Sequence, residues 1–190
     1  YMLCRGPAET VSYAAAFEAV LGMNPHTAAV ADLVSTAARH HLAAPDTFDP
    51  ADRDAWLDLL LVEKIQPTLG TGSPVILYDF PASQSALAQV RPGPPAVAER
   101  FELYVDGIEL ANGYHELLDP AELRRRNATA NQHRLADGKP ALPQHSRLLE
   151  AMVAGLPSCA GTALGFDRLV MVATGAKSID EVLAFPIERA

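Results

Sequence analysis

Apolar residues recur with two different periods along the chain, and the change falls close to residue 70. Before that point they recur every three to four residues, which is typical of amphipathic helices. Asn24-Pro25 and Asp49-Pro50 are helix start signals, and Gly22 and Pro67 are stop signals. The expected helices are 12–21, 24 to about 41, and 49 to about 67. We expect them to form a packing segment or cap without chemistry of its own.

After residue 70 the pattern becomes that of short strands. Runs rich in β-branched and aromatic residues, together with one run of small apolar residues, predict strands at 74–80, 101–105, 108–114 and 159–164. Asp106 and Gly107 stand between the second and third of these strands. They are typical of a type I′ hairpin turn, because both central residues of that turn have positive φ.

Three more helices are expected among these strands. One runs over 119–137 with Asp119 as its N-cap, one over 144–154, and the last begins at Gly165. Strands that pair by hairpins among helices predict an α+β fold with an antiparallel β-sheet flanked by helices. We expect one domain over 1–190, with a helical segment at about 12–70 and the sheet at about 71–190.

Composition narrows the class of protein. The chain has 190 residues, of which 49% are hydrophobic, and it holds no apolar run near the roughly 18 residues that cross a bilayer. Its net charge of −8 argues against a broad basic surface for nucleic acid. Cys4 and Cys159 lie far apart, which disfavours a disulfide framework or a zinc site and predicts a cytoplasmic protein. Because the chain opens at Tyr1 without Met, we expect a piece of something longer.

The hairpin carries the most concrete chemistry. If Asp106 and Gly107 form the turn, Tyr104 lies opposite Glu109, and Glu102 shares a face with Glu109. Two carboxylates in this diagonal relation, about 6 to 8 Å apart at Cβ, can share one divalent cation. The other face is apolar and is expected to be the core. The alternative is that both acids are ordinary residues of a solvent-exposed face.

A second polar set follows on the same strand. Asn112, Tyr114 and Glu116 share one face by the two-residue period, but a regular strand would direct them away from Glu109. We therefore predict a β-bulge near 111–113, with Gly113 as a plausible position. Without this bulge, the two polar sets cannot line one pocket.

Arg168 is the third feature. It follows the small-residue run and lies in the first turn of the last helix, where it could reach a phosphate or stack on a flat ring. The alternative is an exposed arginine paired with Asp167. No Walker loop or dinucleotide fingerprint is present. The run Arg124, Arg125 and Arg126 is interpreted as the solvated face of its helix.

These residues resemble a known family. Arg100-Phe101-Glu102, the run 107–117 (GIELANGYHEL) and the run 161–169 (GTALGFDRL) resemble the C-terminal half of a class II lysyl-tRNA synthetase core, the last run being similar to its third signature motif. Within the superfamily, the run 80–89 (FPASQSALAQ), Ala163 and the terminus at 185–190 are more similar to the elongation factor P β-lysine ligases, which modify a protein lysine instead of tRNA.

The resemblance implies ATP and Mg²⁺, lysine or β-lysine as the substrate, and elongation factor P as the acceptor, with tRNA disfavoured. It also implies a homodimer for the full-length protein. The roles that it implies are as follows: Glu102 and Glu109 for Mg²⁺ and ATP, Asn112 for the substrate carboxylate, Tyr114 as a pocket wall, Glu116 for the amino end of the lysyl side chain, Ala163 in the amino-acid pocket, and Arg168 for the γ-phosphate and over the adenine. Arg168 and Glu109 are the expected catalytic residues.

The first and second signature motifs of this superfamily are not found in the chain. We therefore expect this chain alone to be inactive in ATP–pyrophosphate exchange. Two alternatives remain open at this stage. The chain could be the C-terminal fragment of a true lysyl-tRNA synthetase, or a non-catalytic synthetase-like module that binds a partner or an amino acid.

Overall fold

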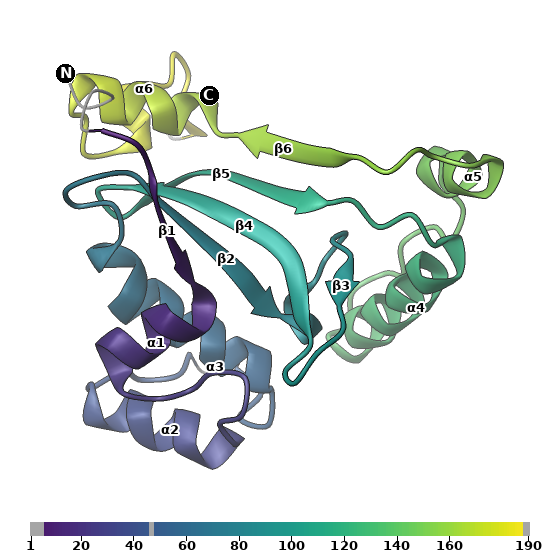
Figure 1. Cartoon of the computed structure of the whole chain (residues 1–190), viewed down its shortest axis with the longest axis horizontal. Helices are drawn as coiled ribbons and strands as arrows, with labels where there is room; N and C mark the ends of the chain where they lie inside the picture. Colours follow the sequence, from purple (N-terminus) through teal and green to yellow (C-terminus); the bar gives the residue numbers. More distant parts are fainter. Residues whose placement is uncertain (1–5, 46–47, 188–190) are drawn as a thin grey trace.

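A six-stranded mixed β-sheet forms the centre of the molecule in the computed structural model, which describes residues 6–45 and 48–187 (Figure 1). The strand order is β1-β2-β4-β5-β6, and the short β3 pairs with β4. The strands are β1 (Glu9–Ser12), β2 (Val75–Pro81), β3 (Val90–Arg91), β4 (Val97–Val105), β5 (Ile108–His115) and β6 (Ala160–Leu164). Neighbouring strands are antiparallel except β1 and β2, which are parallel.

Helices flank the sheet, so the predicted α+β class is confirmed. They are α1 (Tyr13–Leu21), α2 (Val30–Arg39), α3 (Arg53–Leu60), α4 (Pro120–Ala136), α5 (Arg147–Ala154) and α6 (Phe166–Thr174). A π-helical turn η1 (Leu61–Ile65) and 3₁₀ turns η2 (Gln66–Thr68), η3 (Ala82–Gln84) and η4 (Ile179–Glu181) complete the set. Cys4 and residues 188–190 lie outside the described residues, and Cys159 is a free, exposed thiol.

Local capping signals fix most helix bounds. The Ser12 side chain accepts from the backbone N–H of Ala15 at 3.1 Å to begin α1, and Gly22 ends the helix with φ +65°. The predicted start at Asn24 is wrong, because α2 begins six residues later, at Val30. The Asn24 side chain instead accepts from the N–H of His26 at 2.9 Å, which closes a single turn.

Hydrophobic clusters cover both faces of the sheet. On one face, side chains of α1, α3 and η1 pack on Leu77 and Tyr104, which are 0% and 2% exposed. On the other face, Val172 of α6 packs on Val105 and Leu110. Figure 1 shows α1–α3 and α6 at different sides of the sheet, with α4 and α5 together near its far end. These clusters pack on part of each face, whereas β6 is mostly exposed.

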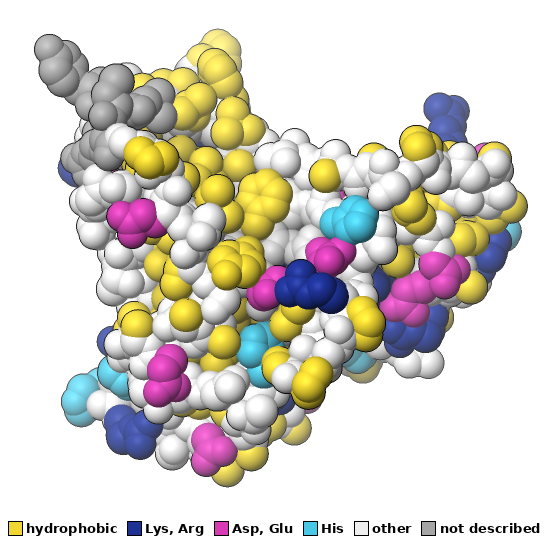
Figure 2. Space-filling view, in the orientation of Figure 1, with side chains coloured by type: hydrophobic (Ala, Val, Ile, Leu, Met, Phe, Trp, Pro, Cys, Tyr) yellow, Lys and Arg dark blue, Asp and Glu magenta, His cyan; other side chains and the backbone are white. Residues whose placement is uncertain are grey.

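Apolar side chains remain exposed at the C-terminal end of β6 and in the residues that follow it. Figure 2 shows hydrophobic side chains gathered around α6. The large exposed residues in this part of the chain are Leu164, Phe166, Phe185 and Ile187. Exposed apolar groups of this size are typical of surfaces that contact other protein segments.

The β4–β5 hairpin has the turn that the sequence predicts. Asp106 and Gly107 have φ +48° and +76°, as a type I′ turn requires. The turn packs on the end of the helical segment, since the Gln66 side-chain amide donates to the carbonyl oxygen of Gly107 at 3.0 Å. A Cβ at Gly107 would lie 3.3 Å from the Cα of Pro67. The hairpin and the helical segment therefore constrain each other.

We expect Gly107→Ala to lower the free energy of unfolding by about 1–2 kcal/mol, because a side chain in the left-handed region costs about that much. Gly72→Ala is the matched control, since Gly72 lacks a positive φ in this range and a Cβ there meets nothing within 4 Å. Urea denaturation followed by circular dichroism measures both variants. Equal losses in the two variants would contradict the assignment of strain to the turn.

Candidate active site

Glu102 lies inside the sheet rather than on a wet face. Its residue is 5% exposed, and it shares a face with Leu77 and Tyr104 that packs against the helical segment. One carboxylate oxygen accepts from the Arg100 guanidinium and the other from the Tyr104 hydroxyl. The prediction that the two acids occupy the wetter side is therefore wrong for Glu102, because that side also holds the main hydrophobic core.

A bulge in β5 aligns the two polar sets, as predicted, although it lies at a different residue. Tyr104 pairs with Glu109 and Leu103 pairs with Ala111, so Leu110 is the extra residue. Because of this insertion, Asn112 pairs with Glu102 instead of following the opposite alternation. The bulge thus lies one residue before the predicted stretch 111–113, and it places both sets on one side of the sheet.

Gly113 has a different role from the one that was predicted. It lies inside the regular part of β5, opposite Phe101. A Cβ at this position would lie 2.6 Å from an atom of the Phe101 ring and 2.7 Å from the carbonyl oxygen of Gly161. Its small size allows this ring and β6 to approach the strand closely.

Arg168 contacts Glu109 from the first turn of α6. Its Nη1 donates to the Glu109 carbonyl oxygen at 3.0 Å and to the carboxylate at 3.1 Å. The N–H of Gly165, the N-cap of α6, donates to the carbonyl oxygen of Leu110 at 2.8 Å. The bulge residue therefore anchors the start of α6, and this anchoring holds Arg168 beside Glu109. The Arg168 side chain remains 47% exposed.

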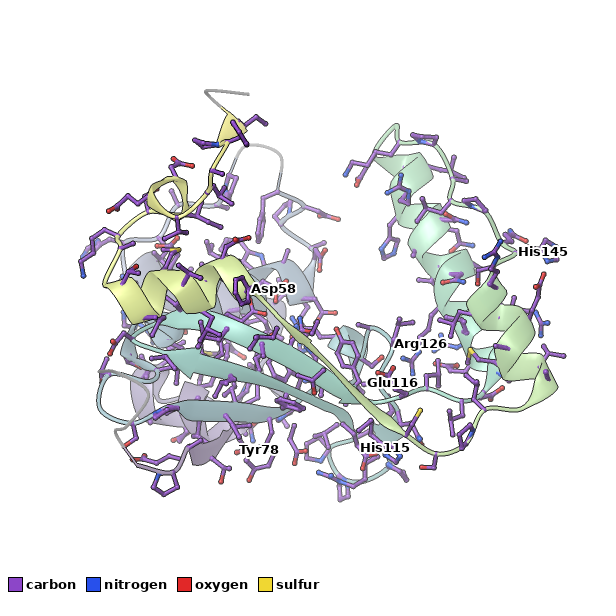
Figure 3. The ribbon with its side chains drawn as sticks, turned by 90° about the horizontal axis from the view of Figure 1, so that it is seen from above. Asp58, Tyr78, His115, Glu116, Arg126 and His145 are labelled. Atoms are coloured by element: carbon purple, nitrogen blue, oxygen red, sulfur yellow. The ribbon has the colours of Figure 1, made fainter. Side chains whose placement is uncertain are left out.

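Residues of the predicted amino-acid pocket line up across β5 and β6. Asn112 pairs with Ala163, and Tyr114 pairs with Gly161. Glu116 follows the end of β5 on the same face by alternation, and Figure 3 shows it on the side of the sheet that faces α4 and Arg126. The structure thus brings Glu102, Glu109, Asn112, Tyr114, Glu116, Ala163 and Arg168 to one continuous stretch of β4, β5, β6 and α6.

Sequence reasoning missed Arg100 as a site residue. Its guanidinium carbon lies 4.4 Å from the centre of the Phe80 ring, and its Nη1 donates to the carbonyl oxygen of Gln84 at 3.0 Å. It also holds the carboxylate of Glu102. A usable signal was present, because Arg100 and Glu102 are two residues apart on one strand and must share a face.

Asp58 of α3 connects the helical segment with this site. Its carboxylate accepts from the Gln84 side-chain amide at 2.8 Å. Burial, and secondly the charge of Asp54, raise the pKa of Asp58 to about 6, while Arg100 opposes the shift. The Asp58 residue as a whole is nonetheless exposed. No local pattern predicts this contact, because the partners are 26 residues apart.

The arginine run on α4 is only partly the solvated face that was expected. Arg125 and Arg126 both pair with Glu122, and these hydrogen bonds lower the pKa of Glu122 to about 2. The Arg126 side chain is 15% exposed and donates to the carbonyl oxygens of Ala86 and Ala88. Arg126 therefore ties α4 to the segment that follows η3.

A pocket of about 550 Å³ lies beside this contact of Arg126, between α4, η3 and the start of α3. Its lining includes Asp54, Ser83, Leu87, Arg126 and His133. Within residues 6–45 and 48–187, no three His, Cys, Asp or Glu side chains cluster closely enough to hold a metal ion. In the same ranges, no helix is both long and apolar enough to cross a membrane.

The fold is that of a class II tRNA synthetase domain. The family model for class II tRNA synthetases (D, K and N) matches residues 7–189, and the chain belongs to this family. Proteins named elongation factor P–(R)-β-lysine ligase are similar over 185 residues, or 97% of the chain, at 48% identity in two Klebsiella pneumoniae strains and 46% in Salmonella dublin. The chain spans 56% of the length of each of these relatives. The resemblance to this ligase group is therefore confirmed.

We expect Asp58→Asn to stabilise the protein at pH 7–8 and to have little effect near pH 4. The folded pKa of about 6 lies above the ordinary value of 3.8, so wild type loses stability as pH rises between these values and the carboxylate becomes charged. Asparagine keeps an oxygen for the Gln84 amide without the charge. Melting temperatures from pH 4 to pH 8 measure the difference.

The control is Asp137→Asn, at an exposed carboxylate that pairs with Lys139. This variant should show no comparable rise in stability across the same pH window. Because Asp58 is partly exposed, its own effect should be smaller than the full shift implies. A constant difference between Asp58→Asn and wild type at every pH would contradict the assigned titration.

Proposed function

We propose that this chain is part of a cytoplasmic ligase that activates lysine or β-lysine with ATP and transfers it to a lysine side chain of elongation factor P. The observation that carries the proposal is the bulge at Leu110, which places Glu102 and Glu109 on the same face as Asn112. On this face, Glu102 and Glu109 would serve the nucleotide, and Asn112 with the residues after it would serve the amino acid. The names of the relatives supply the acceptor.

The oxygen donors of the site suit Mg²⁺. Glu109 is the more accessible donor, and its carboxylate accepts a hydrogen bond from Arg168. Both oxygens of Glu102 accept hydrogen bonds, but each carboxylate oxygen has a second lone pair. Magnesium ions that bind through one or two carboxylates and substrate phosphates fit this donor set. Bound there, Mg²⁺ would neutralise charge on the phosphates of ATP.

The chain's own residues would orient the reacting groups. Arg168 is exposed enough to exchange its contact with Glu109 for a phosphate of ATP, which would free the Glu109 carboxylate. Asn112 would bind the carboxylate of the amino acid, and Tyr114 and Ala163 would line its side chain. Glu116 would bind the distal amine, since a buried ammonium needs a carboxylate partner.

The proposed reaction has two steps. The carboxylate of the substrate attacks the α-phosphorus of ATP, and pyrophosphate leaves, giving an acyl-adenylate. The ε-amino group of the acceptor lysine then attacks the adenylate carbonyl, AMP leaves, and an amide forms. Arg168 would stabilise negative charge on the phosphates during the first step. A homodimer of the full-length protein remains part of this proposal.

Two assays test the function on the longest gene product that contains this chain. Lysine- or (R)-β-lysine-dependent ATP–pyrophosphate exchange reports the first step, and transfer of labelled substrate to elongation factor P reports the second. Labelling of elongation factor P without labelling of tRNA supports the proposal. Labelling of tRNA alone would replace it with a lysyl-tRNA synthetase function.

In that gene product, Glu109→Gln should lower exchange on the order of 10²–10³-fold while leaving the fold intact, because the amide lacks the charge that a metal-bound nucleotide requires. Glu63→Gln, at an exposed acid of η1, is the matched control and should retain activity. Circular dichroism and the urea midpoint check the fold. Near-wild-type exchange in Glu109→Gln would remove Glu109 from the nucleotide site.

A further inference from the structure

The backbone of Glu116 is held from two sides. Its N–H donates to the carbonyl oxygen of Cys159 at 3.0 Å, and its carbonyl oxygen accepts from the Gln89 side-chain amide at 3.1 Å. Ala88 forms an isolated bridge with Glu116. Three segments that are distant in sequence thus meet at one residue, just past the end of β5.

His115 extends this attachment to the opposite side of the sheet. Its Nδ1 lies 2.5 Å from the Glu99 carboxylate, and its Nε2 lies 3.1 Å from Nε2 of Gln89 and 3.2 Å from Oγ of Ser158. With a proton on Nδ1, the ring donates to Glu99, and the lone pair of Nε2 accepts from the side-chain amide of Gln89. Figure 3 shows His115 and Glu116 on opposite sides of the strand end.

Other contacts steady this cluster. Arg91 pairs with Glu99 at 3.5 Å and with Asp79 at 2.6 Å. Figure 2 shows a compact group of acidic, basic and histidine side chains close to β3, the strand that carries Arg91. Both ring nitrogens of His115 are therefore held by polar contacts. The backbone of Glu116, the next residue, is held as well.

The Glu116 carboxylate rests against the backbone of β6. A Cβ built on Gly161 would lie 2.2 Å from Oε1 of Glu116 and 3.3 Å from its Cδ. Real Cβ atoms do not approach an oxygen this closely, so any side chain at residue 161 would displace the carboxylate. The backbone angles of Gly161 are not left-handed, so the need for glycine at this position is one of space.

We propose that Gln89, His115 and Gly161 are positioning residues for the Glu116 carboxylate, and that Gly161 thereby determines specificity for a substrate with a distal amine. Gln89 and His115 fix the backbone of Glu116, and Gly161 leaves the space that its carboxylate occupies. The inference rests on the proposed role of Glu116 in amine binding. Beyond that role, it explains which residues fix the position of the Glu116 carboxylate.

The order Ser158, His115, Glu99 also resembles a nucleophile, base and acid of a hydrolase. The side-chain amide of Gln89 distinguishes the two interpretations. It donates to His115 Nε2 and to the carbonyl oxygen of Glu116, so the imidazole lone pair that a serine base needs is already shared. These contacts therefore favour a positioning role toward Glu116 over a hydrolase role.

The first test compares Gly161→Ala with Thr162→Ala, a change on the same strand whose side chain points to the other face. For Gly161→Ala we expect kcat/KM for lysine or (R)-β-lysine to fall about tenfold or more through KM, the size of one lost charge-assisted hydrogen bond. KM for ATP and the inhibition constant of norleucine, which lacks the distal amine, should stay within about twofold of the wild-type values. Equal losses for ATP and norleucine would overturn the inference.

The second test uses Gln89→Leu, which removes both amide donors at similar size. Alone it should raise KM for the amine substrate. In a Glu116→Gln background the same change should have no further effect, because its action passes through the carboxylate. Additive effects in the double variant would overturn the inference.

Different results would overturn the proposed function and the positioning role of Gln89, His115 and Gly161. If wild type shows no exchange with either lysine or (R)-β-lysine, the proposed function is overturned and this inference with it. If wild type is active but neither Gly161→Ala nor Gln89→Leu changes KM for the amine substrate, only the inference is overturned. All measurements use the longest gene product that contains the chain.

Discussion

One extra residue in β5 determines which side chains can act together. Leu110 is inserted between Glu109, opposite Tyr104, and Ala111, opposite Leu103. In a strand of period two, a single insertion moves every later side chain to the other face. The same residue also accepts a hydrogen bond from the start of α6 through its carbonyl oxygen. Register, pocket composition and the placement of Arg168 therefore depend on one local irregularity.

Two ion pairs lie on this face. Arg100 contacts Glu102 along one strand, and Arg168 contacts Glu109 from α6. An uncompensated carboxylate as buried as Glu102 would be costly, and burial raises the pKa of the neighbouring Tyr104 hydroxyl, which stays protonated and donates to Glu102. The pairs differ in exposure, because Glu102 is enclosed whereas Arg168 is half exposed. Exchange of partners with a ligand is therefore physically easier at Glu109 than at Glu102.

Features encoded within a few residues could be predicted from the sequence, and features that depend on distant partners could not. The end of the first helix at Gly22 and the turn at Asp106 and Gly107 are local, and both are confirmed. The need for a bulge was deduced from the two polar sets, but its location depends on how α6 and β6 pack against β5. The parallel β1 has four residues and pairs with a strand more than 60 residues later, so no local pattern indicates it.

The helical segment, which was interpreted as a packing segment or cap without chemistry of its own, also contacts the candidate site through Asp58. Helical periodicity shows which residues of α3 are apolar, but it does not show what the polar residues face. Asp58 contacts Gln84, whose carbonyl oxygen accepts from Arg100, and Arg100 in turn holds Glu102. The Arg100 guanidinium stacks on the Phe80 ring, and its burial costs desolvation energy. The acidic side chain of Asp58 on α3 offsets part of this cost. Asp58 therefore adds a negative charge near Arg100, while the proposed amino-acid pocket is built from β5, β6 and the residue that follows β5.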